Sequence, residues 1–522
     1  MTRALWIGCT GTVAVLLGAL AALAPLGALL IGGAFLLAVA VFVFANRLRH
    51  AALSLLGLVL IGYAFLGRGF AYIGVPPLFI GEVALGAGLV AVAVAGWARN
   101  PLRSRLVRLL TAFMAWGALC TIPYLGEFGV TALRDAVIWG YALFAVVVAA
   151  LVDGPRLHAV VEEQYPRLVP VLLLWAPVAA VAYRFAGQYI PQLPGSDVPI
   201  IGYKGGDMAV HLAGAAAFML LGLHRQRGHS ARLEWVWWFV WIVGVGMAIT
   251  TVRAALLAVC GALLPIFVLQ PNRRWVKLLA VGLATVMIAA AFDVSLDIGN
   301  GRTISVDQII RNVQSIVGNG DHDALSGTKE WRLAWWREIV DYTFRGPHFW
   351  TGKGYGINLA DDDGFQVYDD HSLRSPHNGH LTVLARSGVP GLVLWTGLQL
   401  GFAASLGGAY LRATLAGKTR WAKIYLWLLS YWSAFVINGT FDVYLEGPQG
   451  GIWFWSLFGF GLAALAVQQE EQEGVSHDPS GSPGPQLLPA AGGRGRRLRG
   501  RDHPPAAPWA SRVPPARAQP EG

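Results

Sequence analysis

The residues best suited to chemistry lie in the segment Ser375–Trp395, which reads SPHNGHLTVLARSGVPGLVLW. Ser375 is placed to cap a helix and Pro376 to take its first position, where a missing N–H is not needed. His377 then falls in the first helical turn, with Asn378 next to it. Because the positive end of a helix disfavours an imidazolium, we expect a neutral His377 that can accept a proton. The free N–H groups of the same turn favour a bound anion such as phosphate.

Two arginines are candidates to hold that anion. Arg253 separates two apolar runs in AITTVRAALLAV, and an ionised side chain costs roughly 2.5–3.5 kcal/mol at the centre of a membrane helix. Arg332 and Trp336 have the i, i+4 spacing that places two side chains on one helical face. The simpler alternatives are a histidine that only caps a helix and an arginine that only reaches the lipid headgroups. Together, the histidine and the arginines favour a site in which a base lies next to cations.

Further residues are expected to contact the substrate. They are Asn378, Arg134, Arg337, Tyr355, Gly354, His380 and Arg68. Arg134 has an equally good structural interpretation as the ion-pair partner of Asp135, and the segment Gly352–Gly356 is equally well a simple turn. The aspartates at 361–363 and 369–370 suggest a divalent metal, but runs of this kind are more often solvated loops. We therefore predict no metal site.

The elements that position these residues are built to cross a membrane. Of the 522 residues, 55% are hydrophobic and 13% are charged, whereas soluble proteins carry roughly 25% charged residues. Long apolar runs alternate with arginine-rich connections, which predicts an all-α polytopic membrane protein of about 12–14 transmembrane helices. The net charge of +10 comes from these connections and the tail, so no nucleic-acid partner is expected. The three cysteines all fall in apolar runs, which predicts no disulfide framework.

The same pattern predicts the organisation of the chain. It indicates a transmembrane bundle (1–292), a large extracytoplasmic loop (293–387), further transmembrane helices (388–467) and a disordered cytoplasmic tail (468–522). The first expected spans are 5–24, 27–45 and 51–66, and an uncleaved first span is favoured over a signal peptide because a second apolar run follows at once. Since the basic connections should be cytoplasmic, both termini are expected inside and the large loop outside.

Two helices are expected inside the large loop. One is short and lies near 305–317. The other carries Trp331, Trp335 and Ile339 at i, i+4, i+8, which is one face of a helix. Because tryptophan is enriched at the interface between lipid and water, we predict that this helix lies on the outer membrane surface and exposes Arg332.

The order of these motifs resembles the O-antigen ligase and O-antigen polymerase superfamily of bacterial envelope enzymes. The points of similarity are the arginine after Thr251-Val252, W-R-x-x-x-W at 331–336, H-N-x-x-L at 377–381 and S-G-x-x-G at 387–391. They are spread over most of residues 60–450, and their order is more specific than any single motif. The acidic stretch Asp361–Asp370 and the long basic tail depart from the family pattern.

The resemblance implies a glycosyltransferase of the bacterial inner membrane with a GT-C-like helical fold. Its donor would be a glycan on undecaprenyl diphosphate, and its acceptor a hydroxyl of lipid A core or of another glycan. His377 would be the base or substrate-orienting residue, and Arg253 and Arg332 would bind the pyrophosphate. Neither a metal nor another cofactor is implied, and single displacement would invert the anomeric carbon. The alternatives are a polymerase, a protein O-glycosylating enzyme, a transporter of lipid-linked glycans and a non-catalytic scaffold.

Overall fold

A computed structural model describes residues 25–95, 104–194, 197–225, 231–270, 273–291, 296–297, 303–304 and 323–476. The chain divides into two units, residues 1–472 and 473–522, and the description below concerns the first. Its longer helices are α2 (Pro25–Leu66), α4 (Ile80–Ala95), α5 (Arg105–Thr121), α7 (Val130–Gly140), α8 (Ala142–Leu151), α10 (Tyr165–Phe185), α11 (Gly205–Leu220), α12 (Ala231–Thr251), α13 (Arg253–Leu269), α14 (Arg273–Ala291), α16 (Asp323–Phe344), α18 (Gly379–Leu415), α19 (Thr419–Phe441) and α20 (Pro448–Ser476).

Short elements connect the longer helices. The short helices are α3 (Arg68–Ala71), α6 (Leu125–Phe128), α9 (Gly154–Ala159) and α17 (Leu359–Asp362), together with the 3-10 turns η2 (Ile122–Tyr124), η4 (Gly187–Tyr189) and η5 (Tyr444–Glu446) and the π-turn η3 (Val160–Gln164). Strands β1 (Gly74–Val75) and β2 (Leu78–Phe79) form one antiparallel pair, and β3 (Leu296–Asp297) and β4 (Thr303–Ile304) form another. The predicted helix near 305–317 and the tail beyond Ser476 lie outside the described residues.

The all-α polytopic class is confirmed, and the expected first span, 5–24, lies outside the described residues. Within the described residues, 6 helical segments are long and apolar enough to cross a membrane: Phe44–Leu66, Arg105–Phe128, Gly154–Phe185, Leu233–Thr251, Gly379–Leu415 and Pro448–Glu473. Helices α7 and α8, bent by 48° where they meet, would form one further span if they cross together. Three shorter apolar helices are Ile80–Val94, Gly205–Leu220 and Arg253–Leu269. The expected separate spans 27–45 and 51–66 are one helix, α2. The residues between them, 46–50, include no glycine or proline that would end a helix.

Helix α11 is the buried centre of the bundle. Every one of its residues is buried, and most of them are alanine, glycine or another small or apolar residue. Small side chains allow the neighbouring backbones to approach closely. At Gly214, for example, an added Cβ would lie 2.6 Å from the ring of Tyr431 on α19.

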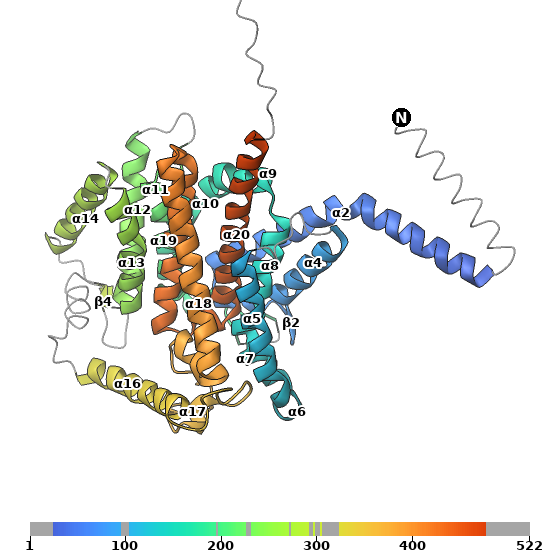
Figure 1. Cartoon of the computed structure of the whole chain (residues 1–522). Helices are drawn as coiled ribbons and strands as arrows, with labels where there is room; N and C mark the ends of the chain where they lie inside the picture. The colour runs from blue at the N-terminus through green and yellow to red at the C-terminus, as the bar shows by residue number, and fades with distance from the viewer. Residues whose placement is uncertain are drawn as a thin grey trace, which may run out of the picture. The chain divides into compact units, whose positions relative to one another are not determined.

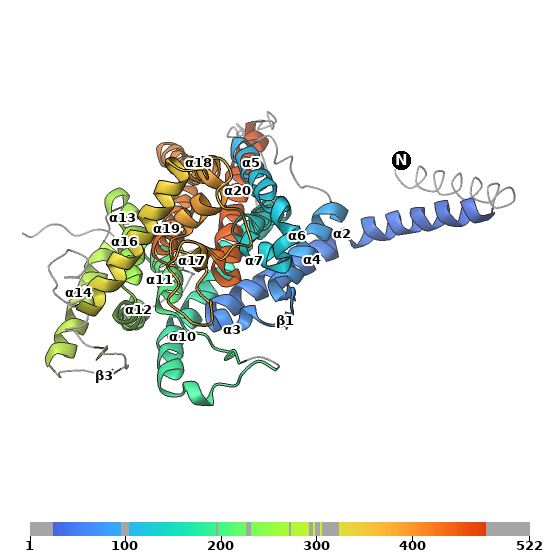
Figure 2. The same ribbon diagram turned by 90° about the horizontal axis from the view of Figure 1, so that it is seen from below.

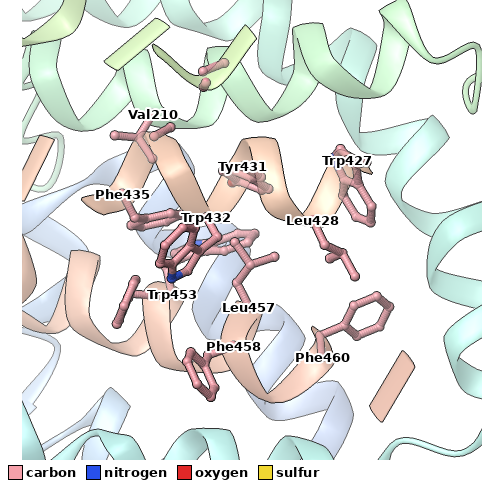
Figure 3. Packing of buried hydrophobic residues seen from close by; sticks show 14 of the residues in the cluster. Val210, Trp427, Leu428, Tyr431, Trp432, Phe435, Trp453, Leu457, Phe458 and Phe460 are labelled. Atoms are coloured by element: carbon pink, nitrogen blue, oxygen red, sulfur yellow. The ribbon is translucent and has the colours of Figure 1, made fainter. Parts of the chain in front are cut away.

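Aromatic packing joins α19 to α20. In the close view, Trp427, Tyr431 and Phe435 extend from α19 towards Trp453 and other residues of α20 (Figure 3). The Tyr431 and Trp453 ring centroids are 5.9 Å apart. Such buried rings contribute large apolar areas, so they fix the neighbouring helices in one arrangement.

The helices of the bundle bring their ends together in two groups. At one end, Lys204, which precedes α11, forms an ion pair with Asp442, which follows α19, at 2.6 Å. At the other end, Arg274 of α14 donates to the carbonyl of Leu220 at the end of α11, with Nη1–O 2.7 Å. Basic connections gather at this second end, as the alternation in the sequence predicts. The predicted domain boundaries and membrane orientation remain predictions.

Helix α16 crosses the first end of the bundle, where α18 begins and α19 ends (Figures 1 and 2). The prediction for its tryptophan face was wrong. Trp335 and Ile339 are fully buried against loop residues such as Leu373, not against lipid. The Trp335 ring stacks on Phe365 with centroids 5.4 Å apart, so the indole face is used to fasten the loop. Sequence periodicity located the face, but it could not identify what covers it.

Candidate functional site

His377 lies just before α18 and not in its first turn. The helix begins at Gly379, and its N-cap is Asn378, whose side-chain oxygen accepts the N–H groups of His380 and Leu381 at 3.0 and 3.1 Å. The predicted Ser375 cap and Pro376 first position were therefore wrong. Asn is as good a cap as Ser, and the asparagine nearer to the helical run takes the role. The helix also breaks at Gly388, where φ is 68°.

The backbone of His377 is in the left-handed region, with φ 54°. For a residue other than glycine this conformation is uncommon, and it is held only where the surroundings require it. The surroundings are visible in the preceding residue, because the Trp336 indole of α16 donates to the Pro376 carbonyl at 2.9 Å. The loop that carries the imidazole is therefore fixed by α16 on one side and by α18 on the other.

The imidazole of His377 is neutral at physiological pH. Burial, followed by the positive charges of Arg332 and Lys204, lowers the pKa of His377 to about 4, and Asp442 opposes this shift. The direction agrees with the neutral histidine expected from the sequence, but the causes are burial and cations and not the end of a helix. Within the described residues, neither ring nitrogen has a hydrogen-bond partner. The ring is therefore free to accept a proton from a ligand.

Arg332 of α16 is directed at the same end of α19. Its Nη1 donates to the carbonyl of Phe441, the last residue of α19, at 3.1 Å. Its Nε is buried and has no partner within the described residues. Burial lowers the pKa of the Arg332 guanidinium, and the nearby Asp442 opposes that effect. A guanidinium with a free buried N–H suits a bound anion, since it can present several donors to phosphate oxygens.

Sequence reasoning missed Lys204 and Asp442. The Lys204 ammonium is 2.6 Å from the Asp442 carboxylate, which is 8% exposed. Burial lowers the pKa of Lys204, but Asp207 and Asp442 outweigh it and leave that pKa above its ordinary value. The signals in the sequence were a lysine directly before the glycines of an outer helix start and an aspartate directly after another helix. Neither stands out without the fold that pairs them.

Arg68 and Arg253 lie at the same end of the bundle. Arg68 begins α3, is exposed, donates to the Tyr72 hydroxyl at 2.9 Å, and is close enough for its charge to act on Lys204. Arg253 begins α13 directly after Val252, which is the only residue between α12 and α13. Val252 Cγ1 lies 3.6 Å from the position of a Cβ on Gly206, at the start of α11. The predicted arginines from three separate segments therefore share one end of the bundle with His377.

A buried ion-pair network anchors the loop that carries His377. Asp135 of α7 accepts from Arg374 at 2.8 Å and from Arg386 of α18 at 3.0 Å. Arg386 is 2% exposed and also donates to the Gly354 carbonyl at 3.3 Å. The interpretation of Asp135 as a structural ion-pair member is correct, but its partners are not Arg134. The Arg134 side chain is exposed and has no hydrogen bond or ion pair within the described part of the chain.

The glycine-rich turn packs into the protein. The hydroxyl of Tyr355 is buried and lies 2.7 Å from Ser387 Oγ, and Gly354 N–H donates to the Arg386 carbonyl at 3.2 Å. Gly352 and Gly354 have φ of 63° and 80°. Added Cβ atoms would meet backbone at the first and the Tyr124 ring at the second. These placements favour the structural alternative for the segment Gly352–Gly356.

The aspartate run is held by ion pairs and is only partly solvated. Lys353 Nζ lies 2.5 Å from both Asp362 and Asp363, and Asp363 also accepts from the Trp335 indole at 2.6 Å. Asp361 pairs with His371 at 2.8 Å. The side chain of Asp363 is 0% exposed, so the expectation of a fully solvated loop was wrong at that position.

His380 and Arg337 differ in placement. The Trp395 indole donates to His380 Nδ1 at 2.9 Å, which leaves the proton on Nε2, and this N–H faces Thr440 Oγ1 at 3.1 Å. With both nitrogens engaged, His380 fastens the start of α18 to the end of α19 and supports its neighbour His377. Arg337 is exposed on α16 and has no ion-pair partner within the described residues.

Taken together, the fold and the site define a polytopic membrane protein with a neutral histidine and cations at one end of its bundle. Residues 238–396 match the sequence model of a protein family described as O-antigen ligase. This match confirms the similarity to the O-antigen ligase and polymerase superfamily that the motifs indicate. The matched segment contains Arg253, Arg332 and His377. No curated protein matches the chain.

Proposed function

We propose that the protein transfers a glycan from undecaprenyl diphosphate to a hydroxyl of an acceptor. The observation that carries the proposal is the position of His377 next to Arg332 and Lys204, as a neutral imidazole without a hydrogen-bond partner among the described residues. A base that lies beside cations suits a reaction in which a hydroxyl loses a proton while a diphosphate leaves. The O-antigen ligase match supports this class of reaction in general.

In the proposed step, the acceptor oxygen attacks the anomeric carbon of the lipid-linked sugar. His377 takes the hydroxyl proton, a role worth roughly 10²–10⁴ in rate. The new bond joins the acceptor oxygen to C1, and the bond between C1 and the phosphate oxygen breaks. Undecaprenyl diphosphate departs with the electron pair, so one inversion occurs at C1.

The charge that grows on the leaving diphosphate would be stabilised by Arg332 and Arg253. The Nε of Arg332, unpaired within the described part of the chain, is available to donate a further hydrogen bond. Lys204 adds a second positive charge near the imidazole. Preorganised donors aimed at developing charge are a large source of catalysis. These cations supply the charge that a metal would otherwise bring, and the proposed reaction therefore uses none.

We further propose that the site faces outward from the bacterial inner membrane and that both termini are cytoplasmic. The basic connections, including Arg225, Arg274 and Lys277, lie at the end of the bundle opposite to His377. Positive connections favour the cytoplasmic side. The site would then meet substrates where no nucleotide is needed, because the diphosphate bond already carries the free energy for transfer.

The test is transfer by the purified protein in detergent, with EDTA present. The assay supplies an undecaprenyl-diphosphate glycan and a panel of acceptors that includes lipid A core, free glycan and a protein. We expect transfer by the wild type and its loss in His377→Ala, with His371→Ala as a control from the exposed part of the same loop. Equal transfer by wild type and His377→Ala would remove this histidine from the mechanism.

The acceptor that reacts would separate a ligase from a polymerase or a protein-modifying enzyme. A transporter or scaffold would bind the lipid-linked glycan without consuming it. The bond chemistry is favoured over transport because Lys204, Arg332 and Asp442, the charged groups near His377, lie at an end of the bundle. A transporter would be expected to place such groups along a cavity in the middle of the membrane. The product is also informative, since retention at the anomeric carbon would contradict a single displacement.

A further inference from the structure

A small cavity lies next to the site, at the start of α11. Its lining includes Tyr203, Lys204, Asp207, Tyr444 and Gln449. The volume is about 20 Å³, and a cavity needs roughly 10–15 Å³ to hold one water. The cavity therefore has room for one small polar group and not for a whole sugar ring.

The polar atoms of the lining are not satisfied by the protein. Asp207 is 9% exposed, and its Oδ1 has no hydrogen-bond partner within the described residues. Gln449 hydrogen bonds to the same carboxyl group. The Tyr203 hydroxyl is also buried without a partner in the described part of the chain. An unpaired buried polar group costs about 1–3 kcal/mol. A polar ligand group bound in the cavity would offset part of this cost.

The cavity adjoins the proposed base through Lys204. This lysine lines the cavity and pairs with Asp442, and its charge acts on the His377 ring. The cavity and the proposed base therefore share Lys204 as a neighbour. None of the roles assigned in the proposed mechanism uses Asp207, Tyr203 or Gln449.

The chemistry of the lining selects an uncharged hydrogen-bond donor. Asp207 Oδ1, which has no partner within the described residues, can accept a hydrogen bond from a hydroxyl group, whereas a phosphate or carboxylate oxygen has no proton to donate to it. The amide of Gln449 and the hydroxyl of Tyr203 can exchange further hydrogen bonds with the same group, and the Tyr444 ring adds an apolar wall. This set fits a hydroxyl or hydroxymethyl group of a sugar.

We propose that this cavity is a specificity subsite that receives one hydroxyl or hydroxymethyl group of a substrate saccharide, with Asp207 as its acceptor. The inference rests on the proposed glycan transfer and adds the residues that recognise a hydroxyl group of the saccharide. The saccharide is the acceptor or the first sugar of the donor, and the experiment separates these two sources.

The experiment compares each sugar with its deoxy counterparts, first as acceptor and then as the first sugar of the donor. At one hydroxyl position of the saccharide, the wild type should show a kcat/KM roughly 10–100-fold higher for the hydroxylated sugar than for its deoxy counterpart. A site built to bond a hydroxyl group rejects the analogue that lacks it. In Asp207→Asn and Tyr203→Phe this ratio should fall at least about fivefold. Asp341→Asn, an exposed aspartate of α16, is the matched control and should keep the ratio.

The side on which the ratio changes identifies the source of the hydroxyl group. An unchanged ratio for every position in folded, active variants would overturn the subsite. The Tyr203→Phe variant guards against misfolding, because it removes only one unpaired hydroxyl.

A binding measurement separates this inference from the proposed function. If no acceptor is glycosylated by the wild type, thermal unfolding in the presence of methyl glycosides and their deoxy counterparts still reports the subsite. Stabilisation by a hydroxylated glycoside that is lost in Asp207→Asn would support the subsite even though transfer has failed. Equal stabilisation of both proteins by every pair would overturn it.

Discussion

Arg332→Gln should separate function from stability. In the wild type, the guanidinium donates to the Phe441 carbonyl, and its Nε is buried with no partner among the residues that the structure describes. The glutamine amide nitrogen takes about the place of the arginine Nε and is too short to reach that carbonyl, so this hydrogen bond is lost. The bond is worth about 0.5–1.5 kcal/mol, and removal of a poorly paired buried charge offsets part of its loss. We therefore expect the free energy of unfolding to change by less than about 1 kcal/mol.

Activity should respond much more strongly to the same change. If Arg332 stabilises the departing diphosphate, loss of its charge removes one preorganised donor, which costs about 10²–10³ in kcat, or roughly 2.7–4 kcal/mol. Arg332→Lys should recover only part of this, because an ammonium lacks the planar fork that pairs with two phosphate oxygens. The fold decrease in kcat should be larger than the fold increase in the KM for the lipid-linked donor.

The assay is initial-rate transfer of a labelled glycan from undecaprenyl diphosphate, with thermal unfolding of the same preparations in the same detergent. Arg345→Gln is the matched control, because Arg345 follows α16 and its side chain is 82% exposed in a pair with Asp341. A kcat for Arg332→Gln within threefold of the wild type, with an unchanged unfolding temperature, would refute the role of this arginine in the reaction.

Further predictions concern the base and the loop that holds it. The pKa of His377 is lowered to about 4, so the base stays neutral and kcat/KM should be constant from pH 8 to near 5 and fall only below that. If kcat/KM instead falls to half at a pH near the ordinary histidine pKa, this prediction is wrong. Asp135→Asn leaves a buried arginine unpaired and should lower the free energy of unfolding by about 3–5 kcal/mol, whereas Asp341→Asn at an exposed pair should cost under about 1 kcal/mol in the same denaturation experiment. Gly352→Ala and Gly364→Ala both demand a left-handed alanine, costing about 1–2 kcal/mol, but only at Gly352 would the new methyl meet backbone, so its loss of unfolding temperature should be clearly larger.

Composition and periodicity were sufficient to predict the class of fold. Apolar runs bounded by arginines indicate membrane helices whatever their tertiary contacts, because the bilayer constrains each helix separately. The number of spans was less predictable. A break between two apolar runs depends on helix-ending residues, and charged residues such as Arg47 and Arg49 in α2 do not end a helix.

The chemical types in the site were more predictable than their geometry. His377 and Arg332 could be singled out because a histidine and an arginine next to membrane helices are costly unless they have a role. Lys204 and Asp442 were not, since each is ordinary in its own segment and they become a pair only when α11 and α19 pack together. The helix cap shows the same limit, because Ser375 and Asn378 both satisfy the local rule and only the fold distinguishes them.

The charged groups around His377 are not evenly balanced. Lys204 pairs with Asp442, the charge of Asp442 also acts on Arg332, and the exposed Arg68 adds its positive charge nearby. Next to His377, Lys204, Arg332 and Arg68 outnumber the carboxylates Asp442 and Asp207. Buried polar atoms such as Arg332 Nε also have no hydrogen-bond partner within the described residues.

A protein optimised for stability alone would pair or remove these groups, since each unpaired one costs free energy. Their retention is explained if an anion completes the site during each turnover. The diphosphate of a lipid-linked glycan has the charge to do so, and after transfer the same cations hold the leaving group. The unpaired donors that cost stability are therefore the groups that would hold the leaving diphosphate of a transferase.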